Sequence, residues 1–143
     1  MPSAQRTVVI NRPIADVFAF FADAENDPKW RPAVKEIKRE GPLGVGARYA
    51  QKVAGPGGRA VAADIEVTGY ELNSSVRFQV VAGPVRPQGE YQFSETNGGT
   101  SLTFSLNCEL GGLKKIFMAK PVQKSMDAEM ANLDTAKQLL EGA

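Results

Sequence analysis

The sequence contains no histidine and only one cysteine, Cys108. Histidine is the most common general base and a frequent metal ligand, so its absence excludes histidine-dependent triads and the usual zinc sites. A single cysteine cannot form a disulfide within the chain, which is consistent with a reducing compartment. No loop of clustered acids is present to hold Mg²⁺ or Ca²⁺. We therefore expect no metal and no other cofactor.

Long apolar runs and blocks of like charge are also missing. The longest apolar stretches are far shorter than the roughly 18 residues that cross a bilayer, and residues 1–6 contain no apolar signal segment. The 17 basic and 16 acidic residues are interspersed and give a net charge of +1. A nucleic-acid surface would show clustered Lys and Arg instead. These features predict a cytoplasmic protein with no integral membrane segment and no nucleic-acid partner.

The 143 residues match the usual size of one domain, which we expect to span 1–143. A chain of this length buries enough surface to fold without a disulfide or a metal. Nothing in the sequence distinguishes a monomer from a homodimer.

Alternation of apolar and polar residues predicts strands over most of the chain. Between residues 100 and 109, for example, Leu102, Phe104, Leu106 and Cys108 share one face. One dry and one wet face is typical of an antiparallel sheet, and Asn97-Gly98-Gly99 is a hairpin signal. The expected strands are residues 5–10, 34–40, 47–54, 60–71, 75–82, 88–95 and 100–109.

Helical periodicity marks the remaining segments. Apolar residues at 14, 17, 18 and 21 predict a helix that ends near Asp23, and residues 25–32 resemble a second short helical turn. A long helix is expected from about Leu113 to Leu140, with a possible break at Pro121. A run of strands followed by a helix that covers one face indicates an α+β fold.

This order of elements resembles the START-like (SRPBCC) superfamily, in particular its polyketide cyclase/dehydrase branch. The similarity is carried by the helix from Pro13 to Phe21, by Asp27-Pro28-Lys29-Trp30, and by the turn 41–46 followed by Arg48-Tyr49. The resemblance implies a helix-grip fold, in which a seven-stranded curved antiparallel sheet wraps around a long C-terminal helix, with two short helices after the first strand. It also implies a cavity between sheet and helix that binds lipids, sterols or polyketides, and in some members catalyses cyclisation or dehydration.

Residues on the inner face of the sheet and on the apolar side of the long helix are candidates to line such a cavity. Pockets of this kind are mostly apolar with a few polar groups. The alternative for the apolar members is that they only fill the core, and for the tyrosines that their hydroxyls bind backbone or water. The candidate ligand-binding residues are Trp30, Tyr49, Gln51, Phe78, Tyr91, Phe93, Phe104, Met126, Glu129 and Met130.

Glu129 is the one candidate for chemistry. On a helical wheel of about 100° per residue it falls inside an apolar stripe, between Val122 and Ala136 in angle. The stripe is made of Val122, Met126, Leu133, Ala136 and Leu140. A carboxylate there must be paired, hydrogen-bonded or protonated. It is either a cavity acid or the partner of a cation such as an arginine, or it lies at a hydrated rim. Trp30 is either a residue of the cavity mouth or a core anchor.

Three functions remain open at this stage. The first is binding of a small hydrophobic or aromatic ligand, lipid-like or polyketide-like. The second is a cyclase/dehydrase enzyme that uses Glu129 or a pocket tyrosine as acid or base. The third is a lipid-transfer or protein-interaction module built around Trp30. We expect Cys108 to be a buried, unreactive thiol. We expect Lys114, Lys115, Lys120 and Lys124 to form a solvated face, and the alternative is a basic cluster that attracts anionic lipid surfaces.

Overall fold

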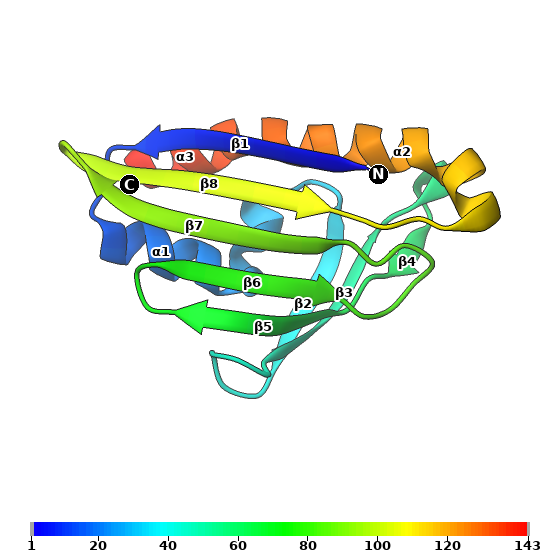
Figure 1. Ribbon diagram of the computed structural model, residues 1–143. Helices are drawn as coiled ribbons and strands as arrows, with labels where there is room; N and C mark the ends of the chain where they lie inside the picture. The colour runs from blue at the N-terminus through cyan, green and yellow to red at the C-terminus, as the bar shows by residue number, and fades with distance from the viewer. Residues whose placement is uncertain (1, 143) are drawn as a thin grey trace.

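A curled antiparallel sheet wraps around the C-terminal helices in the computed structural model, which describes residues 2–142 (Figure 1). The strands are β1 (Ser3–Ile10), β2 (Val34–Glu40), β3 (Arg48–Ala54), β4 (Ala60–Ala62), β5 (Ile65–Glu71), β6 (Ser75–Val80), β7 (Gln88–Thr96) and β8 (Gly99–Asn107). Seven of them follow the order β1-β8-β7-β6-β5-β3-β2, and the short β4 pairs with β3 off this path. The predicted helix-grip fold is confirmed.

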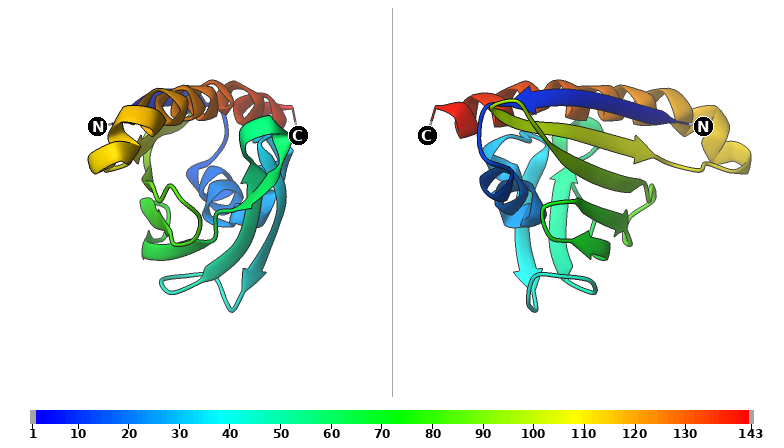
Figure 2. Two further views of the ribbon diagram at one scale, coloured as in Figure 1. Left: turned by 90° about the vertical axis from the view of Figure 1, so that its right-hand side faces the viewer. Right: turned by 60° about the vertical axis from the view of Figure 1, so that its left-hand side comes forward.

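The helical elements lie on the concave side of the sheet. They are α1 (Ile14–Ala22), the 3₁₀ helix η1 (Ala24–Lys29), α2 (Gly112–Ala131) and α3 (Leu133–Glu141). A second 3₁₀ turn, η2 (Pro56–Gly58), joins β3 to β4. Figure 2 shows α1 and η1 inside the curve of the sheet, while α2 and α3 run along β1. The core therefore sits between the inner sheet face and two helical layers.

The strand expected over residues 60–71 is interrupted, which corrects the prediction. It divides into β4 and β5 at Ala63 and Asp64. Here the backbone N–H of Gln51 donates to the Asp64 carboxylate at 3.2 Å. A side-chain oxygen thus takes the place of a ladder carbonyl, so the regular pairing stops for two residues.

The long C-terminal helix breaks at Asn132, not at Pro121 as expected. Pro121 leaves the Phe117 carbonyl without its usual donor, but this part of α2 is exposed, so water can hydrate the carbonyl. At the observed break, Arg6 Nη1 donates to the Met130 carbonyl at 3.0 Å. In a continuous helix that carbonyl would accept from Asp134. A contact from β1 therefore accompanies the break.

Side chains fasten the C-terminal helices to the first strand. The apolar stripe faces inward as predicted, because Val122, Met126, Leu133 and Ala136 are all buried. At its edge, Arg6 pairs with Asp134 at 2.6 Å. No helix among residues 2–142 combines the length and hydropathy needed to cross a membrane.

Candidate functional site

A buried ion-pair cluster links η1 to α2. Asp23 caps η1 by accepting from the Glu25 amide, and the following turn places Asp27 four residues before Arg31. Arg31 Nη1 donates to Asp27 Oδ2 at 2.8 Å, and Arg31 Nε donates to Glu129 Oε2. The side chains of Asp27, Glu129 and Arg31 are only 5%, 10% and 15% exposed. Of the alternatives for Glu129, the structure therefore shows the carboxylate paired with an arginine.

Arg31 forms ion pairs with two carboxyl groups at once. Its guanidinium also lies 3.5 Å from Gln51 Oε1, a weak contact at the limit of hydrogen bonding. Gln51 is held in place because its amide nitrogen donates to the Ala63 carbonyl at 2.8 Å. The arrangement joins η1, α2 and β3 through one fork-shaped cation, the geometry for which arginine is suited.

Asp27 is the member of this cluster with unused hydrogen-bonding capacity. Its Oδ1 atom is buried and has no hydrogen-bond partner among the described residues, and the same is true of Trp30 Nε1. The indole N–H lies close enough to lower the pKa of Asp27 slightly, without a well-aligned hydrogen bond. Burial is the larger effect, opposed by Arg31, and raises the pKa of the Asp27 carboxyl to about 6. The carboxyl can thus gain or lose a proton near neutral pH.

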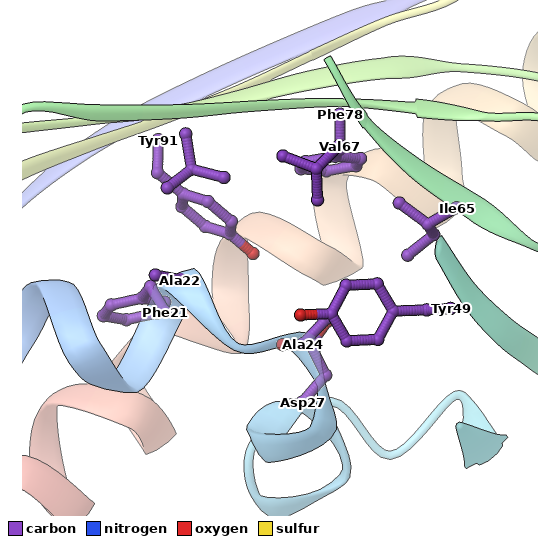
Figure 3. Close-up of a pocket in the computed structure, with 10 residues that line it drawn as sticks. Phe21, Ala22, Ala24, Asp27, Tyr49, Ile65, Val67, Phe78 and Tyr91 are labelled. Carbon is purple, nitrogen blue, oxygen red and sulfur yellow. The ribbon is translucent and has the colours of Figure 1, made fainter. Parts of the chain in front are cut away.

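A small cavity lies beside Asp27, between η1 and the inner face of the sheet (Figure 3). Its volume is about 20 Å³, which is room for about one water molecule. The lining is apolar and aromatic apart from Asp27 and two tyrosine hydroxyls. The lining residues are Phe21, Ala22, Ala24, Asp27, Tyr49, Ile65, Val67, Val76, Phe78 and Tyr91.

The two tyrosines reach this cavity from opposite sides. Tyr91 extends from β7 with its hydroxyl toward the cavity, and Tyr49 extends from β3 toward η1 (Figure 3). The Tyr49 hydroxyl donates to Asp23 Oδ1 at 3.3 Å. Burial raises the pKa of Tyr49 to about 12 and that of Tyr91 well above its ordinary value. Both hydroxyls therefore keep their protons at neutral pH and can act as hydrogen-bond donors.

Only three of the ten residues expected to bind a ligand line this cavity, namely Tyr49, Phe78 and Tyr91. Gln51 and Glu129 belong to the neighbouring ion-pair cluster. Met126 and Met130 are buried on α2 outside the cavity lining. The remaining three are packed in the aromatic core.

That core explains the positions of Trp30, Phe93 and Phe104. Trp30 is 1% exposed, and its ring meets Phe21 at 5.5 Å and Phe104 at 6.1 Å between centroids. Of the two interpretations of Trp30, cavity mouth or core anchor, its position is therefore that of a core anchor. Its side chain presents no surface for a docking module. Phe104 stacks on Tyr91 at 4.5 Å, which fixes the plane of the Tyr91 ring at the cavity wall.

Asp27 and Arg31 were missed as site residues by the sequence analysis. The available signal was their spacing of four residues, which places an acid and a base on one side of a helical turn. Cys108 is buried, as expected, and burial raises the pKa of its thiol. Within residues 2–142 no three acidic or cysteine side chains come together in a way that could hold a metal ion.

Comparison with known proteins gives the family. Residues 1–137 match the family described as polyketide cyclase / dehydrase and lipid transport. The chain belongs to this family. A search of curated proteins returned no match.

Solved structures with the same fold are distant in sequence. The di-domain ARO/CYC StfQ from the steffimycin biosynthetic pathway superposes with a TM-score of 0.80 at 15% identity. The comparison covers 99% of this chain and 51% of StfQ, so the family member described here spans about half the length of that protein. TTHA0849 from Thermus thermophilus gives 0.78 at 20% identity, with 96% and 95% coverage. A START superfamily protein from Mycobacterium smegmatis gives 0.74 at 16% identity, with 98% and 97% coverage.

Proposed function

We propose that this chain binds a small, largely apolar or aromatic molecule in the cavity beside Asp27. The observation that carries the proposal is the unpartnered Asp27 Oδ1, buried at the wall of an aromatic-lined cavity. A buried polar atom without a partner costs free energy, and a ligand hydroxyl or amide would remove that cost. The family description, which includes lipid transport, supports this direction.

The polar group of the ligand would lie between Asp27 and Tyr91. Tyr91 provides a donor and Asp27 provides an acceptor, while the phenyl and aliphatic walls exclude water. This set suits a lipid-like or polyketide-like molecule with one hydroxyl or carbonyl at the buried end.

Binding of such a ligand requires the cavity to expand. A volume of about 20 Å³ does not admit a fatty acid or an aromatic ring. Phe78 is the only aromatic lining residue that is partly exposed, so its ring has the freest path outward. We therefore expect Phe78 to move aside when ligand enters.

Thermal shift with a panel of fatty acids, naphthols and anthraquinones tests this proposal. A ligand that prefers the native state stabilises it by about 2.7 kcal/mol at a concentration of 100 times Kd. Tyr91→Phe and Asp27→Asn should each weaken that ligand, because each removes one hydrogen-bonding atom. Tyr70→Phe is the matched control, since Tyr70 packs on Phe18 and lies outside the cavity lining. If no compound in the panel raises the melting temperature at saturation, the proposal is wrong.

A cyclase/dehydrase activity is the second candidate, and the pKa of Asp27 favours it. A carboxyl with a pKa of about 6 can both donate and accept a proton at neutral pH. In this case Asp27, rather than Glu129, would be the acid or base, because Asp27 lines the cavity and Glu129 does not. Turnover of a poly-β-ketone that Asp27→Asn abolishes, while affinity is retained, would distinguish the enzyme from a binding protein.

A further inference from the structure

The first turns of α2 expose three large apolar side chains. Leu113, Ile116 and Phe117 are 72%, 73% and 70% exposed. Figures 1 and 2 show this yellow end of α2 projecting past the end of the sheet, where no strand lies over it. Three large side chains within five residues form a contiguous apolar patch, here called the α2 tip. Isolated exposed apolar residues are common on protein surfaces, but a contiguous patch indicates an interaction surface.

The α2 tip points away from the body of the protein. At about 100° per residue, Leu113, Ile116 and Phe117 centre on the side of the helix opposite to buried Val122 and Met126. The tip therefore cannot pack against the cavity while α2 remains packed on the sheet as it is in this structure. Its apolar surface faces whatever approaches the molecule from outside.

Lysines surround the α2 tip. Lys120 and Lys124 follow it on the same outward side of the helix, while Lys114 and Lys115 lie within the tip segment itself. Lys114 Nζ donates to the Pro84 carbonyl at 3.0 Å, which ties the tip to the loop before β7. Among residues 2–142, no ion pair uses Lys115, Lys120 or Lys124. The nearest acid on this side of α2 is Asp127, further from the tip.

We propose that the α2 tip docks on an anionic lipid surface. Apolar side chains on a helix, flanked by lysines, match the two layers of such a surface: the acyl boundary accepts the apolar groups and the anionic headgroups attract the cations. The tip residues Leu113, Ile116 and Phe117 enter the boundary, and Lys120 and Lys124 contact the headgroups.

The same charges disfavour a second copy of this chain as the occupant. A symmetric pair of tips would bring the lysines of one copy toward those of the other, because a two-fold interface places the same patch on both sides. Like charges brought together at an interface oppose association. An anionic surface meets no such opposition.

Co-sedimentation with vesicles tests the proposal. One set contains phosphatidylcholine alone, and the other contains equal parts of phosphatidylcholine and phosphatidylglycerol. We expect binding to the anionic set, weakening as salt screens the lysines. Lys120→Gln/Lys124→Gln should lower the partition coefficient by about 25-fold, since one lysine near a charged surface contributes about fivefold. Ile116→Ser/Phe117→Ser should abolish binding.

Matched controls distinguish vesicle binding by the α2 tip from nonspecific adsorption and from binding of ligand in the cavity. Leu72 is 73% exposed in the turn between β5 and β6, so Leu72→Ser removes an equally exposed apolar residue elsewhere. Lys35→Gln/Lys38→Gln removes two exposed charges from β2. Both variants should bind vesicles as the wild type does. Asp27→Asn should also bind normally, so the docking surface and the ligand proposal can fail separately.

Two outcomes would overturn the proposal. The first is equal partitioning of wild type and Ile116→Ser/Phe117→Ser onto anionic vesicles. The second is a wild type that ignores vesicles but forms a dimer at micromolar concentration, which Phe117→Ser dissociates. The second result would assign the α2 tip to self-association. The positions substituted on the α2 tip, at Leu72 and on β2 are exposed, so unchanged melting temperatures should accompany those variants.

Discussion

The pH dependence of folding gives the sharpest test of the buried carboxyl at Asp27. Its pKa rises from 3.8 to about 6 in the folded protein because burial outweighs the attraction of Arg31. Between these two values the folded protein holds a proton that the unfolded chain has released. The free energy of unfolding contributed by this group is therefore complete below pH 3.8 and is lost as the pH rises through about 6.

The size of this loss follows from the two pKa values. A difference of one pKa unit corresponds to about 1.4 kcal/mol, so a change from 3.8 to about 6 corresponds to a loss of about 3 kcal/mol. Asp27→Asn cannot titrate, so the variant should gain that amount relative to the wild type between about pH 4 and about pH 7. With a urea m-value of about 2 kcal/mol/M, the two midpoints should move apart by about 1.5 M.

Urea titrations of both proteins across this pH range provide the measurement. Other carboxyl groups titrate in the same range, but they are common to both proteins and cancel in the difference. Asp127→Asn, an exposed substitution of equal charge change, is the control and should run parallel to the wild type. If the wild type instead gained stability relative to Asp27→Asn as the pH rose, Arg31 would dominate over burial and the reasoning would be refuted.

Three further predictions concern the surrounding structure. Glu129→Leu should cost about 3–5 kcal/mol by leaving Arg31 without one of its two partners, and the further changes Arg31→Met and Asp27→Asn together, which leave no buried charge in the cluster, should recover most of this; an unchanged denaturant midpoint in Glu129→Leu would contradict the buried pair. Gly99→Ala should cost about 1–3 kcal/mol, because the new Cβ would lie 2.4 Å from the Ile10 carbonyl oxygen. Gly111→Ala, with no atom within 4 Å, is its control, and equal melting temperatures would disprove the clash. Cys108 should react with Ellman's reagent only in denaturant, since burial raises the pKa of its thiol; rapid reaction of the native protein would show an accessible thiol.

Periodic patterns of apolar residues predicted which side chains of a strand or helix face the core. The two-residue alternation located the inner faces of β7 and β8, so Tyr91 and Phe104 were correctly expected on the same side. The helical wheel placed Glu129 among buried residues. Both results rest on backbone periodicity, which the sequence carries directly.

Contacts between distant segments could not be predicted in the same way. The arginine that pairs with Glu129 lies 98 positions earlier in the chain. The contact that accompanies the break at Asn132 comes from Arg6, 124 positions before the Met130 carbonyl that it binds. The sequence analysis did not single out Asp27, because its burial depends on the packing of η1 against other segments such as β2 and α1. These contacts are determined by tertiary packing, and a window of a few residues carries no information about it.

Trp30 gives this protein an internal optical reporter. It is the only tryptophan in the sequence, and its indole N–H lies beside the Asp27 carboxyl. Emission from an indole responds to nearby charge, so the intrinsic fluorescence reads a single location, the wall between the aromatic core and the ion-pair cluster. Protonation of Asp27 or arrival of a molecule at its free oxygen would therefore change the emission directly. Occupancy of the site can be followed in the unlabelled protein, whatever the chemical nature of the molecule that enters.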